Sequence, residues 1–288
     1  MFSFIKHRKI WYIISLLVIL PGLVSLALQG LNLGIDFTGG NLVEIRAEQG
    51  TDIQDVRGVI EGLGFGASNN VQISGDSDYL IRTRELSEEE SATLVSSLDE
   101  KLGGVTLLRN ERVGPVIGQE LAVKALLALV VASILMLIYI TYRFELRQGI
   151  AAIIAILHDI LVVLGVFSIF QLEVDSAFVA AILTIIGYSI NDTIIIFDRI
   201  RENLKTRKKG ETLDELVNTS LWQTLARSIN TVLTVMFVLL ALYFLGGTTV
   251  KNFVLAMLIG VASGAYSSIF NASPVWVDLK LREKKNRA

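Results

Sequence analysis

The sequence contains no cysteine among its 288 residues. This absence excludes disulfide bonds and thiolate metal sites, and it leaves the cellular compartment open. Charged residues are also scarce, at 19% of the chain, whereas hydrophobic residues make up 52% and the mean hydropathy is +0.57. Such a composition is typical of a polytopic membrane protein and is too apolar for an ordinary soluble domain.

Six stretches are apolar enough, and long enough, to cross a hydrocarbon layer of about 30 Å. They are residues 10–28, 125–142, 150–172, 176–197, 228–250 and 252–277. We expect the first stretch to be an uncleaved membrane anchor, because its 19 uncharged residues exceed the apolar core of a usual signal peptide. The fold class predicted is a polytopic α-helical membrane protein with six transmembrane helices.

The positions of Lys and Arg predict the orientation of these spans. Sixteen of them fall in the N-terminal segment, the two loops on the same side and the C-terminal tail, whereas the two short loops on the other side contain one, Lys251. Basic residues concentrate on the cytoplasmic side of membrane proteins, so we expect both termini in the cytoplasm. We interpret the basic clusters as topology anchors and not as a nucleic-acid-binding surface.

The hydrophilic segment 30–119 predicts a folded domain on the outer face, between the first and second spans. Its patterns indicate strand, helix, strand, strand, helix, strand, at residues 41–47, 52–63, 71–74, 79–83, 87–102 and 105–113. This βαββαβ order is that of a ferredoxin-like domain. The segment has no His/Cys cluster and no nucleophile beside a base. Its residues 36–40 (DFTGG) lack the Gly-Lys-Ser/Thr of a phosphate loop, so we expect a tight turn there.

The chain is thus expected to have four parts: 1–29, the cytoplasmic N-terminus and first helix; 30–119, the outer domain; 120–278, helices two to six with a cytoplasmic loop at 199–226; and 279–288, a basic cytoplasmic tail. Within that loop, a capping box at 212–215 predicts a short amphipathic helix along the inner membrane surface.

One carboxylate is the leading candidate for a functional role. Asp192 is the only formal charge in the stretch 176–197. An ionised Asp at this depth costs roughly 2.5–3.5 kcal/mol on insertion scales, so an intramembrane carboxylate is a functional hypothesis by default. Tyr188 lies four residues earlier and shares its helix face, and Asn191 and Thr193 widen the polar patch.

Arg227, which opens the fifth span, is the expected charged partner of Asp192 because both lie near the cytoplasmic boundary. Arg227, Asn230, Thr231 and Thr234 follow helical spacing and form one polar stripe. A stripe facing the Tyr188 and Asp192 face predicts a wet, charged seam between two helices. The alternative is a static ion pair that holds the helices together, and buried pairs are weak evidence for stability.

His158 and Asp159 lie in the middle of the third span. They fit a proton path or a polar helix contact, with simple packing favoured for His158, and no particular Ser marks a catalytic site. Small and polar residues follow helical spacing in the sixth span and predict close helix packing. They are Gly260, Ser263, Gly264, Ser267, Ser268 and Asn271.

Three stretches together resemble the SecF family, the membrane subunits that work with SecD beside the bacterial protein-export channel. They are residues 31–40 (LNLGIDFTGG), 113–115 (VGP), and 187–192 (GYSIND) running on to 198–203 (DRIREN). Residues 157–159 (LHD) and 227–231 (RSINT) also look like family positions. The resemblance covers the whole chain.

The resemblance implies a non-enzymatic subunit of the resistance-nodulation-division superfamily in the bacterial cytoplasmic membrane. Its expected role is to use the proton-motive force to help complete the export of unfolded proteins, with Asp192 and Arg227 on the proton path beside Asp159 and His158. The expected partners are a SecD-like subunit, the SecYEG channel, unfolded secretory proteins and the lipid bilayer, with SecA and YajC-like proteins as further candidates. No cofactor, metal or nucleic acid is expected.

Three other functions remain open from the sequence. One is half of a proton-driven exporter of lipids or small amphiphiles, although the single outer domain leaves little room for a substrate chamber. Another is a structural scaffold, against which Asp192 argues. The third, an intramembrane protease, is disfavoured because facing spans show no Ser/His or paired-Asp constellation.

Overall fold

A computed structural model describes residues 2–65, 71–73 and 77–287 of the chain. The chain divides into two compact units, one formed by Met1–Asn32 with Ala128–Ala288 and the other by Leu33–Leu127. The first unit is helical, and the second contains a four-stranded sheet.

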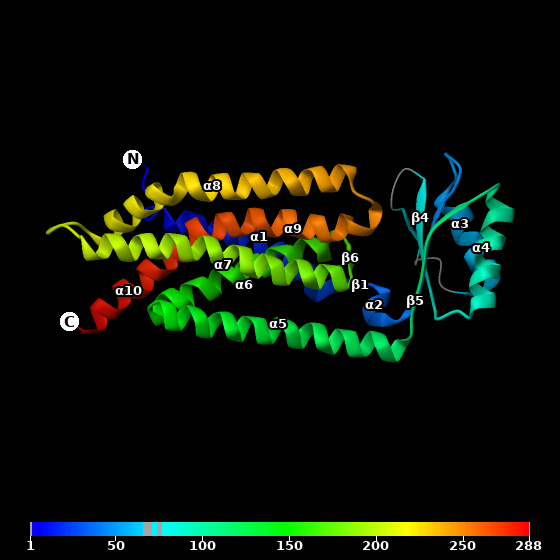
Figure 1. Cartoon of the computed structure of the whole chain (residues 1–288), viewed down its shortest axis with the longest axis horizontal. Coiled ribbons are helices and arrows are strands. Elements are labelled where there is room, and N and C mark those ends of the chain that lie inside the picture. The colour runs from blue at the N-terminus through cyan, green and yellow to red at the C-terminus, as the bar shows by residue number, and fades with distance from the viewer. Residues whose placement is uncertain (1, 66–70, 74–76, 288) are drawn as a thin grey trace. The chain divides into compact units, whose positions relative to one another are not determined.

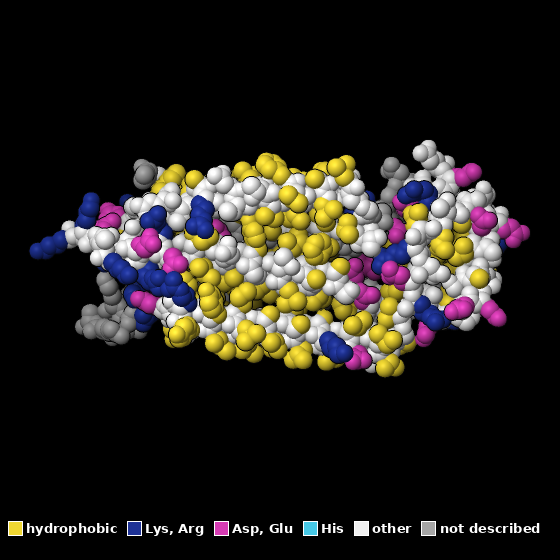
Figure 2. All heavy atoms as spheres, viewed as in Figure 1, with side chains coloured by type: hydrophobic (Ala, Val, Ile, Leu, Met, Phe, Trp, Pro, Cys, Tyr) yellow, Lys and Arg dark blue, Asp and Glu magenta, His cyan; other side chains and the backbone are white. Residues whose placement is uncertain are grey.

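Six helices within the described residues are long and apolar enough to cross a membrane, which confirms the six predicted spans (Figure 1). They are α1 (Arg8–Gln29), α5 (Pro115–Arg143), α6 (Leu146–Ile169), α7 (Ser176–Lys205), α8 (Leu213–Leu245), and α9 (Thr248–Ser267), which continues through a π-helical segment (Ser268–Ala272) into α10 (Ser273–Arg287). Hydrophobic side chains cover the middle of the helical unit in Figure 2, while Lys and Arg gather at the end that carries both termini.

Close helix packing in this unit depends on glycine. A Cβ atom on Gly22 of α1 would lie 2.6 Å from the Cα atom of Gly165 on α6, so only glycine lets these two helices approach so closely. A Cβ atom on Gly260 of α9 would meet the side chain of Ile185 on α7 at 2.3 Å. The small residues of the sixth span therefore lie at a tight α7–α9 contact, as their spacing predicts.

The segment between α7 and α8 is shorter than expected. In place of a loop over residues 199–226 with a separate amphipathic helix, α7 continues to Lys205 and α8 begins at Leu213. The predicted capping box is present, since Thr212 and Glu215 cap each other's backbone N–H groups. No Gly or Pro follows it before the fifth span, so the helix that starts there runs on without a break.

Ion pairs link three helices at the end of the helical unit that carries the termini. Arg8 of α1 lies 3.1 Å from Asp214 of α8 and 2.8 Å from Asp278 of α10. The Tyr12 hydroxyl donates a second hydrogen bond to Asp278, at 3.0 Å.

The second unit follows the predicted order of elements. After the single-turn helix α2 (Ile35–Thr38), its elements are β2 (Gly40–Arg46), α3 (Ile53–Leu63), β3 (Val71–Ile73), β4 (Asp78–Thr83), α4 (Glu88–Leu102) and β5 (Thr106–Val113). Two further strands are very short, β1 (Asn32–Leu33) and β6 (Glu173–Val174). The sheet order is β3-β4-β2-β5, and all neighbouring strands are antiparallel. The predicted connection at 75–78 lies partly outside the described residues.

The core of this unit lies between one face of the sheet and helices α3 and α4. Its buried side chains include Val43, Ile45, Val59, Ile81 and Leu94. Alternate residues of β2 supply this core, because successive side chains of a strand point to opposite faces. By contrast, no residue of β5, the strand at one edge of the sheet, is fully buried.

Helix α4 begins at the predicted capping box. The Ser87 hydroxyl accepts a hydrogen bond from the backbone N–H of Glu90, and the Glu90 carboxylate accepts one from the backbone N–H of Ser87. The Arg84 guanidinium, 2.6 Å away, lowers the pKa of Glu90 from 4.5 to about 2, and the bond from Ser87 adds to this effect. The helix ends at Gly103, whose φ of 79° is the left-handed conformation that glycine adopts without strain.

The predicted turn at residues 36–40 is partly helical. Residues of this motif form α2, and the chain then turns at Gly39 and Gly40, with φ of 73° and 121°. A Cβ atom on Gly39 would lie 2.8 Å from Pro115, and one on Gly40 would lie 2.4 Å from the backbone oxygen of Thr83. Both glycines are thus required by conformation and by close packing.

Candidate functional site: buried carboxylates between membrane helices

Asp192 is buried in the middle of the helical unit. The apolar run of α7 carries it to a position where the side chain is 4% exposed, facing α8. The Ser228 hydroxyl of α8 donates a hydrogen bond of 2.6 Å to Asp192 Oδ1. The other carboxylate oxygen, Oδ2, is buried and has no hydrogen-bond partner among the described residues. Asp192 is therefore only half satisfied by its surroundings.

The expected direct pair between Asp192 and Arg227 is absent from the described part of the chain. Arg227 has an exposed side chain, and Ser228 takes the contact with the carboxylate instead. Consecutive residues of a helix point about 100° apart, because one turn contains 3.6 residues. The depth argument brings Arg227 to the level of Asp192. The rotation of α8 about its axis then decides whether Arg227 or Ser228 faces α7.

The predicted polar stripe of α8 lies on the exposed side of that helix. Arg227, Asn230, Thr231 and Thr234 are all exposed in the isolated chain. The two threonine hydroxyls donate to carbonyl oxygens of α8 itself, so these bonds stay within one helix. Thr231 nevertheless interacts with Tyr188 of α7, and the charge of Arg227 acts on Asp192, so the wet, charged seam between the two helices stays a prediction.

The polar residues around Asp192 on α7 separate into two groups. Asn191 is exposed and Tyr188 is half-buried. Thr193 is buried and forms a hydrogen bond of 2.8 Å with the hydroxyl of Ser268, at the start of the π-helical segment. Polar residues next to Asp192 thus contact the α9 side of the unit as well as its outer surface.

Asp159 of α6 is the second buried carboxylate, and it is fully satisfied. Three serine hydroxyls donate to it: Ser189 of α7 and Ser267 of α9 bind Oδ2 at 2.7 Å, and Ser263 of α9 binds Oδ1 at 2.6 Å. The Nδ1 atom of His158 lies 3.0 Å from Oδ1. We call Asp159, Ser189, Ser263 and Ser267 the serine clasp, because they join α6, α7 and α9.

His158 contacts the carboxylate of the clasp and packs against an aromatic ring. Its imidazole stacks on Tyr266, with ring centroids 5.8 Å apart, and its Nε2 atom is buried with no partner in the described structure. This arrangement agrees with the expectation that His158 is a packing residue with a hydrogen bond.

Sequence reasoning missed the partners of both carboxylates. Ser263 and Ser267 are four residues apart, so they share a helix face, and that spacing was a usable signal that we assigned to packing alone. The assignment was incomplete, because a Cβ atom on Gly264 between them would lie only 3.1 Å from the Cβ atom of Ser189, so the glycine lets the third serine approach closely. Ser228 carried no signal beyond its place next to Arg227.

Metal chemistry finds no support in the part of the chain that the structure describes, where no group of three or more His, Cys, Asp or Glu side chains converges. The site consists of oxygen acceptors and hydroxyl donors inside a helical bundle. Such an arrangement can bind or release a proton and can tie helices together.

Comparison with known proteins identifies the family. Residues 94–282 match the family described as "Protein export membrane protein SecD/SecF, C-terminal", and residues 24–51 match the "SecD/SecF GG Motif". SecF of Thermobaculum terrenum is 45% identical over 95% of this chain and 92% of its own. SecF of Acidaminococcus fermentans is 42% identical over 99% of both chains. The chain belongs to the SecD/SecF family.

The crystal structure of SecDF from Thermus thermophilus has the same fold as this member of the SecD/SecF family, with a TM-score of 0.90 and 37% identity. The match covers 97% of this chain and 38% of that one. The chain likewise spans 39% of the SecDF protein of Bacillus subtilis, at 40% identity. The resemblance seen in the sequence is thus confirmed, and the protein is a multi-pass membrane protein with a role in protein export. Gly39 and Gly40 lie within the GG Motif match, which agrees with their required conformation.

Proposed function

We propose that this chain is a SecF-like subunit of the Sec translocase that uses the proton-motive force to assist late export of unfolded proteins across the bacterial cytoplasmic membrane. It acts without catalysing a covalent reaction. The observation that carries this proposal is Asp192, a buried carboxylate with one oxygen bound to α8 and the other without a partner among the described residues.

A proton at Asp192 Oδ2 changes the contact between α7 and α8. Hydrogen bonds to a carboxylate are about twice as strong as neutral ones, so neutralising Asp192 weakens the bond from Ser228. One charge crossing 100 mV releases about 2.3 kcal/mol. This is similar to the roughly 1.5–3 kcal/mol of one hydrogen bond to a charged group. The free energy of proton uptake and release is therefore large enough to shift the balance between two arrangements of α7 and α8.

Arg227 and the two residues of α6 have different roles in this proposal. Arg227 supplies a counter-charge at the depth of Asp192, one residue before the serine that binds it. Asp159 and His158 border the proton path. Each Asp159 oxygen already accepts from a serine, so this carboxylate suits a fixed position beside the path better than a relay.

The exposed polar stripe of α8 supports a partner in the membrane. An Arg and several polar side chains at membrane depth are costly when they face lipid, and such residues usually face protein or a water-filled cavity. A SecD-like subunit covering α8 satisfies this requirement, and in SecDF relatives the matching segment is part of a longer chain. SecYEG, SecA, YajC-like proteins and unfolded secretory proteins complete the proposed partners.

Orientation and the second unit complete the proposal. The Lys and Arg distribution supports both termini in the cytoplasm, and in this proposal the Leu33–Leu127 unit lies outside it. A βαββαβ order with strand order β3-β4-β2-β5 supports a ferredoxin-like extracytoplasmic domain.

Export into inverted membrane vesicles tests the function. A model secreted protein is added outside vesicles that carry the chain and its SecD-like partner. Its transport into the vesicles is measured with and without an imposed proton gradient. Asp192→Asn is compared with Asp198→Asn on the same helix, whose carboxylate is ion-paired at 3.0 Å with Arg201. We expect the gradient-dependent part of export to disappear only in Asp192→Asn, with assembly intact in both variants.

If gradient-dependent export survives in Asp192→Asn, this carboxylate is not in the coupling path and the proposal fails. If Asp198→Asn abolishes it equally, the effect is a general loss of a charge on α7, and the assignment to Asp192 also fails.

A further inference from the structure

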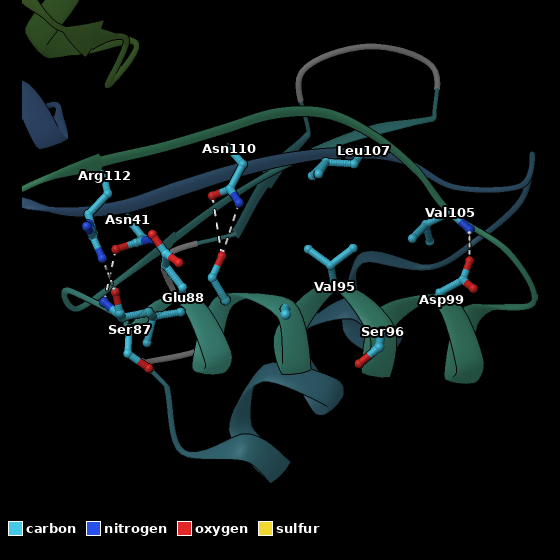
Figure 3. Close-up of a pocket in the computed structure, with 13 residues that line it drawn as sticks. Asn41, Ser87, Glu88, Val95, Ser96, Asp99, Val105, Leu107, Asn110 and Arg112 are labelled. Atoms are coloured by element: carbon cyan, nitrogen blue, oxygen red, sulfur yellow. Dashed lines mark hydrogen bonds between the residues drawn. The ribbon is translucent and has the colours of Figure 1, made fainter.

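The edge strand β5 of the second unit forms one wall of a groove whose other wall is helix α4 (Figure 3). The groove has a volume of about 720 Å³. Its floor and walls include apolar side chains from both elements, and Leu107 of β5 remains 43% exposed there. Edge strands present unpaired backbone N–H and C=O groups, which makes them templates for another strand.

A β-bulge aims the side chains of β5 into this groove. Glu44 of β2 pairs with Arg109, but the next residue, Ile45, pairs with Leu107, so Leu108 is an extra residue in β5. Because side chains alternate along a strand, the extra residue moves Leu107 to the same face as Asn110. Without the bulge Leu107 would point to the opposite face, where Leu108 and Arg109 lie.

Hydrogen bonds hold the two walls of the groove in place, as Figure 3 shows. The Asn110 side chain bonds the Ser91 hydroxyl of α4 at 3.1 Å. Asp99, near the end of α4, accepts from the backbone N–H of Val105 at 2.8 Å. Between these two contacts the groove is lined by apolar side chains, Val95 and Leu107 among them. The opening is therefore preorganised, and a ligand does not have to create it.

The charges around the groove favour a basic ligand. Two carboxylates of α4, Glu88 and Asp99, line the groove, together with one basic residue of β5, Arg112. Glu88 lines one end of the groove beside Arg112, and Asp99 lines the other end. An extended segment with small apolar side chains and flanking Lys or Arg residues is complementary to this pattern.

We infer that the β5–α4 groove binds an extended segment of the exported polypeptide by addition of a strand to the edge of the sheet. This inference rests on the proposed export function. Strand addition takes its affinity from main-chain hydrogen bonds and only its selectivity from side chains, so it tolerates many sequences.

Binding of a defined peptide to the purified full-length chain in lipid nanodiscs tests the inference. The probe is a fluorescent peptide of alternating Thr and Val with a Lys at each end. Its counterpart has the same sequence with N-methyl groups on alternate backbone nitrogens, which removes the donors of one strand edge. We expect the affinity of the N-methylated peptide to be at least about tenfold lower, because it loses several backbone hydrogen bonds.

Two matched variants of β5 locate the site. Leu107→Glu places a carboxylate inside the groove and is expected to weaken peptide binding about tenfold, whereas Leu108→Glu on the opposite face is expected to leave it unchanged. A peptide with Glu at each end is expected to bind more weakly than the Lys-flanked peptide. The two residues are similarly exposed, at 43% and 39%, so the same substitution is comparable at both positions.

Equal binding of the normal and N-methylated peptides excludes strand addition and overturns the inference. So does equal behaviour of the two β5 variants, or crosslinking of position 107 to a second copy of this chain in place of the peptide. The export assay with Asp192→Asn is independent of these measurements. Its failure removes the proposed function, while a negative peptide result removes only the groove.

Discussion

Asp159 and Asp192, the carboxylates buried between membrane helices, are expected to respond unequally to the same substitution. Asp159→Asn and Asp192→Asn each replace one carboxylate oxygen with an amide NH₂ group of almost the same shape. In Asp159, Oδ1 accepts a hydrogen bond from one serine and Oδ2 accepts from two, so replacing either oxygen removes an acceptor in use. In Asp192, the amide can occupy the position of Oδ2, which has no partner among the residues described.

The magnitudes follow from these contacts. The amide nitrogen that Asp159→Asn introduces is a donor, so it cannot accept from the hydroxyls that faced the lost oxygen, and the remaining bonds lose the carboxylate charge. With about 1.5 kcal/mol for each of two lost charge-assisted bonds, Asp159→Asn destabilises the protein by about 3 kcal/mol. Asp192→Asn keeps the bond from Ser228 to a neutral oxygen and costs about 1 kcal/mol. The difference of about 2 kcal/mol corresponds to about 30-fold in the unfolding equilibrium.

Equilibrium unfolding in mixed detergent micelles, followed by tryptophan fluorescence, measures both free energies. Single substitutions of Ser263 and Ser267 by Ala serve as controls, each expected to cost about 1 kcal/mol because one donor is removed and the carboxylate keeps the others. If Asp159→Asn unfolds within about 0.5 kcal/mol of the unaltered protein, or no differently from Asp192→Asn, the serine clasp does not hold α6, α7 and α9 together.

Two other predictions concern packing and pH. Gly22→Val forces α1 away from Gly165 and is expected to cost about 1–3 kcal/mol in the same unfolding assay, whereas Gly187→Val, where a Cβ atom meets nothing within 4 Å, serves as its control. Glu90→Gln keeps the capping box but loses the ion pair with Arg84. The pKa of Glu90 falls from 4.5 to about 2 on folding. The stabilisation that the Glu90 carboxylate gives is therefore present above about pH 4.5 and is lost as the pH falls towards 2. Thermal unfolding at low salt should therefore show a lower midpoint for Glu90→Gln at pH 7 and a vanishing difference near pH 2; a constant difference, or one that survives high salt, contradicts this account.

Local signals in the sequence were enough to predict most elements of the fold. Charge-free length identified the six spans, and capping boxes at Ser87 and Thr212 located two helix starts. The error at α8 arose because a change from amphipathic to apolar pattern looked like a boundary. Only a residue that breaks the helix would have ended it, and none is present before Ser228.

The candidate site was predictable in depth but not in rotation. Asp192 stood out because charge is rare in an apolar helix, and the depth argument brought α8 to the right level. Which residue of α8 touches the carboxylate depends on the angle at which α8 packs on α7, and that angle is set by many small contacts. A shift of one residue, about 100° around the helix, exchanges Arg227 for Ser228.

The two carboxylates together indicate where a proton can move helices at low cost. The serine clasp joins α6, α7 and α9 through three hydroxyl bonds to one carboxylate, so this part of the unit resists rearrangement. At the level of Asp192, the Ser228 hydroxyl of α8 bonds the carboxylate on α7, and from Asn230 onward most of α8 is exposed in the isolated chain. A charge change at Asp192 therefore acts directly on the hydrogen bond from Ser228 of α8, while the clasp keeps α6, α7 and α9 in register.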